Sequence, residues 1–211
     1  MRLSIQTEKI GLLSALILTC AAFSPITTVQ PALSRPAATS PEEKPIVYEE
    51  TKNGKTFVVT KVLVKAHIDR VWPILADYNN APRTFSLLKK CELLEDKGSK
   101  KIVKHELAPS GLPDTYEYIV EIQECPPKTM EWHRISGDFK EVDGFWKLEP
   151  TDMGRCTMVT YASHVNGGFF MPQMLIKRQL RADMPVALAA LKTKAEGPTQ
   201  IASRHQIDRT Q

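Results

Sequence analysis

Aromatic side chains are the residues of this sequence whose types and spacing most clearly suggest chemistry, and that chemistry is ligand contact. Alternation typical of β-strands would place five rings on one face of a sheet: Tyr116, Tyr118, Trp132, Trp146 and Tyr161. Such rings offer flat apolar area, and their hydroxyl and indole groups can orient a bound molecule. The same five residues could be ordinary core, so both alternatives stay open.

Histidines fall in the same region, but their spacing does not favour a metal site. His105, His133 and His164 lie in separate strand-like runs without an HxH or HxxxH pattern, so we expect no zinc. His105 shares the apolar register of its run with Val103 and Leu107. It should therefore point inward, either towards a ligand or as a core histidine with its own hydrogen bonds.

The sequence contains no recognisable catalytic constellation. Ser110 and Ser136 are each followed by glycine but lack the strand–turn–helix context of an activated serine, and Cys125 is followed by two prolines. We therefore assign no catalytic residue and no cofactor. A cyclase would still be compatible with this sequence, because it needs little more than a shaped cavity with a Tyr or His beside an enolisable ketone.

The two ends of the chain differ in composition from its middle. Residues 1–34 contain an uncharged apolar run at 10–23, which is short for a membrane span and fits a secretory signal. We expect a signal peptide or N-terminal anchor, and hence an exported protein. Residues 35–53 are rich in Pro, Ala, Ser and Glu and predict a flexible tether, and the polar residues 197–211 predict a disordered tail.

Residues 54–196 remain for a single domain. The chain carries 28 basic and 24 acidic residues, a formal net charge of +4, with no Lys/Arg block. This balance argues against a nucleic-acid partner.

The pattern within this domain predicts one sheet and one long helix. A β-branched strand over 55–66 precedes a short helix within 67–82 and a second helix or turn at 82–85. Turn signals then divide 87–165 into six strands, and a helix follows over about 172–195. An antiparallel sheet must bury its apolar face, and only the last helix is long enough to cover it. Space left between a curved sheet and a helix is a candidate pocket.

This order resembles the SRPBCC superfamily, which includes START-type lipid-binding domains, polyketide cyclase and dehydrase-like proteins and the coenzyme Q-binding family. The resemblance covers residues 54 to about 196 and is carried by VWPILADYNNAP (71–82), GFWKLEP (144–150), CTMVTYASHV (156–165) and LAALKTKAE (188–196). It implies an α+β helix-grip fold: a seven-stranded antiparallel sheet curled around a long C-terminal helix, with two short helices after the first strand and a hydrophobic cavity.

The segment NGGFFMPQM at 166–174 joins the last predicted strand to the long helix, where the cavity of this fold opens. We expect an apolar mouth or lid formed by Leu112, Phe169, Phe170, Met171 and Met174. Basic residues on the next helical turns would contact a membrane surface: Lys177, Arg178 and Arg181. The alternative is that both phenylalanines cap the core and the basic residues are simply solvated.

The function that these observations favour is binding a hydrophobic small molecule, such as a lipid or isoprenoid quinone, to shield or transport it. Two alternatives remain. One is a cyclase- or dehydratase-type enzyme acting on a polyketide-like ligand, and the other is a partner-binding module whose cavity is filled by its own side chains. Fold resemblance alone does not choose among them.

Overall fold

The computed structural model describes residues 44–169 and 171–198, which form one antiparallel sheet with two α-helices. The α-helices are α1 (Ile68–Ala76) and α2 (Gln173–Glu196), and two 3-10 turns are η1 (Tyr78–Arg83) and η2 (Asp152–Gly154). The strands are β1 (Ile46–Lys52), β2 (Lys55–Val64), β3 (Leu88–Lys97), β4 (Lys100–Leu107), β5 (Tyr116–Cys125), β6 (Thr129–Gly137), β7 (Glu141–Thr151) and β8 (Cys156–Asn166).

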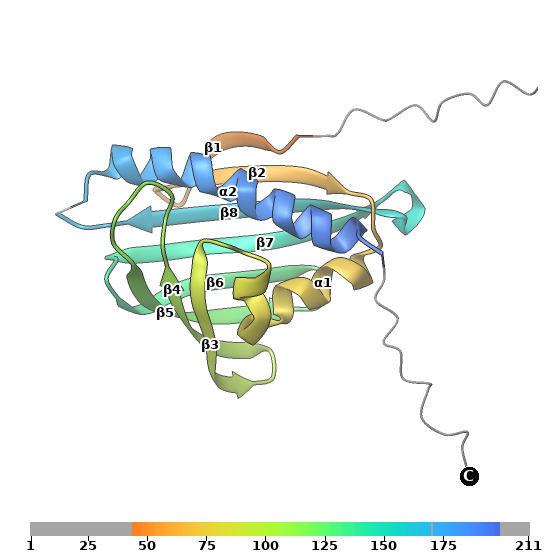
Figure 1. Cartoon of the computed structure of the whole chain (residues 1–211), viewed down its shortest axis with the longest axis horizontal. Coiled ribbons are helices and arrows are strands. Elements are labelled where there is room, and N and C mark those ends of the chain that lie inside the picture. Colours follow the sequence, from red (N-terminus) through yellow and green to blue (C-terminus); the bar gives the residue numbers. More distant parts are fainter. Residues whose placement is uncertain (1–43, 170, 199–211) are drawn as a thin grey trace, which may run out of the picture. The chain divides into compact units, whose positions relative to one another are not determined.

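The sheet has the strand order β1-β2-β8-β7-β6-β5-β4-β3, with every neighbouring pair antiparallel. Helix α2 lies across the sheet and packs against β2, β8 and α1 (Figure 1). This arrangement confirms the α+β helix-grip fold. The seven expected strands correspond to β2 through β8, and β1 is an eighth.

Strand β1 corrects the prediction of a flexible tether over 35–53. Residues 46–52 pair with β2 from Ile46 opposite Lys61 to Lys52 opposite Lys55. The turn between the strands consists of Asn53 and Gly54, both with positive φ (52° and 74°). Asn-Gly is the pair that such a two-residue hairpin turn favours, so this dipeptide outweighs the polar composition around it. Residues 35–43 lie outside the described residues.

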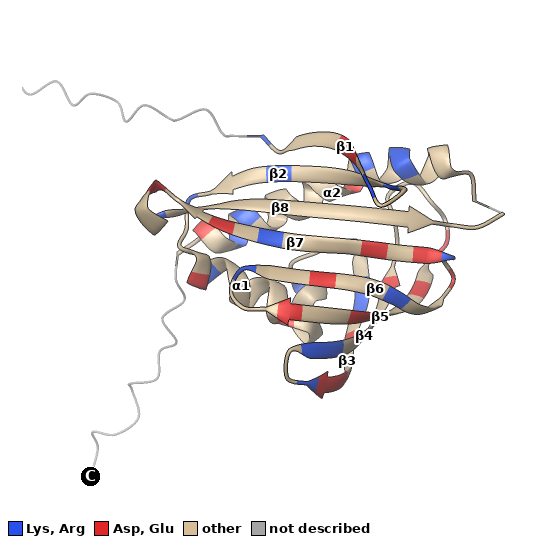
Figure 2. Ribbon diagram, turned by 180° about the vertical axis from the view of Figure 1, so that it is seen from behind, with Lys and Arg blue, Asp and Glu red and all other residues tan. Residues whose placement is uncertain are grey.

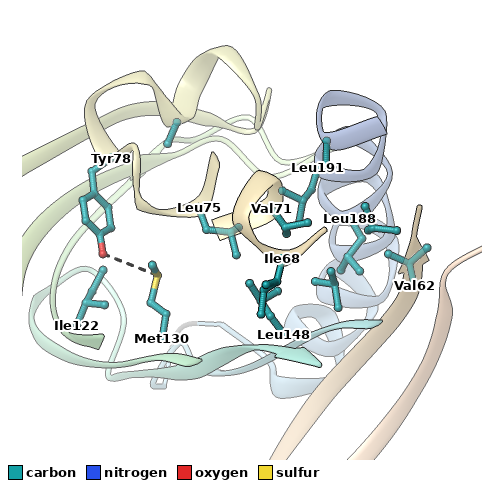
Figure 3. Close-up of a cluster of buried hydrophobic side chains, with 14 of the residues drawn as sticks. Val62, Ile68, Val71, Leu75, Tyr78, Ile122, Met130, Leu148, Leu188 and Leu191 are labelled. Carbon is teal, nitrogen blue, oxygen red and sulfur yellow. Dashed lines mark hydrogen bonds between the residues drawn. The ribbon is translucent and has the colours of Figure 1, made fainter. Parts of the chain in front are cut away.

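The inner face of the sheet is apolar and supports a core beneath the second half of α2. Val64, Val71, Leu148, Leu188 and Leu191 are almost completely buried there. Figure 3 shows this cluster where α1, α2 and the sheet meet. The outer face has charged residues of both signs interspersed along its strands (Figure 2). The expected alternation between a dry and a wet face is therefore present.

The expectations for both ends of the chain lie mostly outside the described residues, namely the signal peptide or anchor at 1–34 and the tail beyond residue 198. Within the described part, no helix has the length and apolar character needed to cross a membrane.

Candidate ligand-binding cavity

A cavity of about 220 Å³ lies between the sheet and the first half of α2. Its walls come from α1, η1, strands β3 to β8, the β4–β5 loop and α2 as far as Ala187. The part of α2 from Leu188 onward does not line it, and Leu188 and Leu191 pack in the core instead. One helix therefore serves two purposes, closing the core at its C-terminal end and covering the cavity at its N-terminal end.

The structure brings the six predicted lining residues to this cavity: His105, Tyr116, Tyr118, Trp132, Trp146 and Tyr161. Trp146 and Tyr161 stack with ring centroids 4.0 Å apart and planes 12° apart. The ring of His105 meets the ring of Tyr118 nearly edge-on, with centroids 5.1 Å apart. Together these pairs give the cavity flat aromatic walls on β4, β5, β7 and β8.

Gly144 provides the space that the indole ring of Trp132 occupies in the cavity wall. It lies opposite Trp132 in the β6–β7 pair. A Cβ atom at Gly144 would be 2.3 Å from Trp132 Cζ2 and 2.5 Å from the Ala162 carbonyl oxygen, closer than real contacts. The missing side chain therefore lets the indole approach the backbone of β7, with its ring centroid 6.0 Å from that of Tyr161 and the two ring planes 46° apart.

His105 lines the cavity as an uncharged side chain, and its Nδ1 atom has no hydrogen-bond partner in the described part of the chain. Burial lowers the pKa of His105 to about 4. Its Nδ1 atom is enclosed and makes no hydrogen bond with any described residue. The alternative of a core histidine with satisfied hydrogen bonds is therefore wrong.

The hydroxyl groups of Tyr118 and Tyr161 are also available. Burial is the main cause that raises the pKa of both residues, and that of Tyr161 rises to about 12. Both hydroxyls therefore stay protonated and can donate. Neither of them forms a hydrogen bond with another residue in the described ranges.

Asp183 is a cavity residue that the sequence analysis missed. It lies on α2 and lines the cavity with Leu180 and Ala187, three residues before it and four after it. A carboxylate on the apolar stripe of a helix was the signal that could have identified it. Its Oδ2 atom accepts hydrogen bonds from Gln179 Nε2 at 2.8 Å and from the Ser110 backbone N–H at 3.3 Å. Its Oδ1 atom is enclosed and has no partner among the described residues.

Tyr78 closes the cavity on the side of η1 and was also missed. Its hydroxyl donates to the carboxylate of Glu124, a residue that is 8% exposed. The same hydroxyl lies 3.8 Å from the sulfur of Met130 (Figure 3). Burial is the main cause that raises the pKa of Tyr78, and Glu124 adds to it. This hydroxyl is already bound to a protein group, so only the ring of Tyr78 is offered to a ligand.

The predicted mouth residues take different positions. Leu112 and Met171 line the cavity. Phe169 is 95% exposed and Met174 is 82% exposed, so the alternative that Phe169 caps the core is wrong. Phe170 lies outside the described residues.

Two of the three predicted basic residues have a partner that the sequence analysis did not foresee. Glu49 on β1 accepts from Lys177 Nζ at 3.3 Å and from Arg181 Nη2 at 2.9 Å. These contacts lower the pKa of Glu49, with Arg181 as the largest cause. Arg178 borders a shallow hollow at the same end of α2 with Gln173.

The chemistry available in the cavity is apolar contact with a few unpaired polar groups. Within the described residues, no group of three or more His, Cys, Asp or Glu could hold a metal ion. Cys91 lines the wall, and burial raises the pKa of its thiol to about 12. A protonated thiol is a poor nucleophile, so Cys91 contributes apolar surface rather than a reactive group.

Comparisons with known proteins agree with this geometry. The family model described as "Polyketide cyclase / dehydrase and lipid transport" matches residues 64–192. A protein of Streptomyces halstedii that is named as a polyketide cyclase is 27% identical over 96 residues, which cover 44% of this chain and 88% of that protein.

Two crystal structures are similar in fold. An aromatase/cyclase from Streptomyces sp. R1128 has a TM-score of 0.59 and 18% identity, covering 66% of this chain and 93% of that one. A STAR-related lipid transfer protein from Xanthomonas axonopodis has a TM-score of 0.61 and 18% identity, covering 72% of this chain and 93% of that one. The family model covers more than half of the chain and includes the residues of the cavity walls, so the chain belongs to the polyketide cyclase/dehydrase and lipid transport family.

Proposed function

We propose that this protein binds a hydrophobic small molecule in the cavity beneath α2 and shields or transports it. The observation that carries this proposal is the cavity of about 220 Å³ with aromatic and aliphatic walls. Burying apolar ligand surface against such walls provides the free energy of binding. The open volume favours a bound ligand over the alternative of a partner-binding module whose cavity is filled by its own side chains.

The size of the cavity limits the size of the ligands that it can enclose. Pockets for small molecules usually measure roughly 300 to 1,000 Å³. A cavity of about 220 Å³ suits a compact ring system or a single apolar chain. A long isoprenoid tail would have to extend through the mouth beside Leu112 and Met171.

Filling the cavity tests the proposal. Ala187 lines the cavity, and Ala189 lies on the exposed side of the same helix. We expect the full chain to bind the dye Nile red saturably. Ala187→Phe should abolish this binding, because the new ring occupies the cavity. Ala189→Phe should bind the dye as the wild type does. Native mass spectrometry of the purified protein should show a co-purified apolar molecule. A wild-type protein without saturable dye binding or bound molecule would contradict the proposal.

A second candidate is a cyclase- or dehydratase-type activity. It is favoured by the names of two Streptomyces relatives and by the uncharged His105 in the cavity, whose Nδ1 atom has no hydrogen-bond partner among the described residues. Incubation with a poly-β-keto thioester, followed by product analysis, tests it. An enzyme should lose turnover abruptly when His105 or Tyr161 is replaced, whereas a carrier should lose affinity in smaller steps.

Membrane contact at the cavity mouth is a further part of the proposed function. It is supported by the exposure of Phe169 and Met174, which lie close in the chain to the cavity-lining residue Met171. Met174→Ser should weaken co-sedimentation with anionic phospholipid vesicles without changing the melting temperature. Met153, fully exposed on the β7–β8 turn, provides a matched control as Met153→Ser. Equal sedimentation of both variants and the wild type would argue against contact.

The exported location is likewise a proposal, supported by the apolar run at 10–23. Fractionation of cells that express the full chain with a C-terminal tag tests it. Recovery from the cytoplasm alone, at full length, would contradict it.

A further inference from the structure

The Asp183 carboxylate is held by two donors to one of its oxygens, and its other oxygen has no donor among the described residues. Gln179 Nε2 and the Ser110 backbone N–H both donate to Oδ2, at 2.8 and 3.3 Å. These two donors come from α2 and from the β4–β5 loop, so they fix the carboxylate from two sides. Oδ1 is enclosed in the part of the chain that the structure describes, and no group there donates to it.

An enclosed carboxylate oxygen without a donor is costly, because burial removes its water and nothing replaces it. A ligand that brings an O–H or N–H group would remove this cost. A ligand whose polar end is a carboxylate or phosphate would increase it, since two negative charges would meet in an apolar cavity. The cavity therefore discriminates by hydrogen-bond donation as well as by size.

Tyr161 supplies a hydrogen-bond donor that complements the acceptor Asp183. It lines the same cavity as Asp183, and the negative charge of Asp183 is the second cause, after burial, that raises the pKa of Tyr161 to about 12. The Tyr161 hydroxyl is therefore a donor. It forms no hydrogen bond with another described residue. Its ring stacks on Trp146, so the donor lies at the edge of a flat aromatic wall.

We propose that the ligand is an uncharged ring compound with a hydroxyl group, which donates to Asp183 Oδ1 and accepts from the Tyr161 hydroxyl. This inference rests on the proposed function, because it names the class of molecule that the cavity binds. A phenol, an alicyclic alcohol or a reduced quinol satisfies both protein groups. A quinone offers only acceptors, and a fatty acid brings a negative charge, so both are disfavoured.

Three naphthalene probes of similar size test the donor requirement in the full chain. Displacement of Nile red is measured with 2-naphthol, 2-methoxynaphthalene, which cannot donate, and 2-naphthoate, which is anionic. We expect 2-naphthol to bind at least about tenfold more tightly than 2-methoxynaphthalene, as for one hydrogen bond to a charged acceptor. We expect 2-naphthoate to bind most weakly.

Asp183→Asn should change this order in a defined way. Gln179 and Ser110 would hold the amide oxygen in the place of Oδ2, so the amide NH2 would face the cavity as a donor. The preference for 2-naphthol over 2-methoxynaphthalene should then fall to about one or reverse. Glu196→Gln, on the same helix and outside the cavity, provides the control and should keep the wild-type ratio.

The outcomes separate the two proposals. If the probes displace Nile red but the wild type does not prefer 2-naphthol, the donor requirement is overturned and cavity binding stands. A preference that persists in Asp183→Asn overturns the role of Asp183 in the same way. If Nile red does not bind saturably at all, the proposed function fails and this inference fails with it. The wild-type ratio needs no variant, so a poorly folded Asp183→Asn protein leaves the test intact.

Discussion

Acidification should destabilise this domain in part through His105. Burial lowers the pKa of His105 from 6.5 to about 4, so the unfolded chain binds a proton more readily than the folded one. The resulting stabilisation is fully present above about pH 6.5 and is lost as the pH falls towards 4. Substitution of this one residue should therefore remove part of the acid sensitivity of the protein.

The magnitude follows from the two pKa values. Each pH unit between them corresponds to about 1.4 kcal/mol in the free energy of unfolding, so the full loss is about 3 kcal/mol. About 2 kcal/mol of it should appear between about pH 7 and pH 5. This range avoids the lowest pH, where many carboxylates also become protonated.

Urea unfolding, followed by tryptophan fluorescence across this range, measures the effect. His105→Phe keeps a ring beside Tyr118 but cannot take up a proton. The wild type should lose about 2 kcal/mol more than this variant between pH 7 and pH 5, because carboxylate contributions cancel in the comparison. Trp132→Phe, a cavity substitution without a titratable group, should follow the pH dependence of the wild type. A difference between the wild type and His105→Phe that stays constant with pH would refute the burial of an uncharged histidine.

Two further predictions concern the supports of the cavity. Gly144→Ala should destabilise the protein by about 1 to 3 kcal/mol in urea unfolding, because the new Cβ overlaps Trp132 and the backbone of β8; unchanged stability would contradict the close approach. Glu49→Gln should lower stability by at most about 1 kcal/mol, and less in high salt, because its ion pairs with Lys177 and Arg181 are partly exposed. A larger loss that salt does not reduce would show that β1 holds α2 by other contacts.

Much of the cavity wall was predictable because strand alternation is local. Tyr116 and Tyr118 are two residues apart on β5 and both face the cavity. The same period places Trp146 inward on β7 and Tyr161 inward on β8. An antiparallel sheet with one buried face makes such an alternation informative.

Strand β1 and Asp183 show where local signals were present but not used. The Asn53-Gly54 turn outweighed the polar composition that suggested a tether. Asp183 interrupted the apolar stripe between Leu180 and Ala187, which marked an inward polar group. In both cases the informative feature was a single dipeptide or residue, and the average composition around it concealed it.

The sequence by itself determined the order of the elements, the inward faces of the strands and the resemblance to a ligand-binding fold, because these depend on periodicity and turns between near neighbours. Only the tertiary structure decided that about 220 Å³ stays open, that His105 Nδ1 and Asp183 Oδ1 lack hydrogen-bond partners among the described residues, and that Glu49 binds Arg181 from 132 positions away. These properties depend on distances between residues remote in the chain, which the packing of α2 against the sheet sets and which local patterns do not encode.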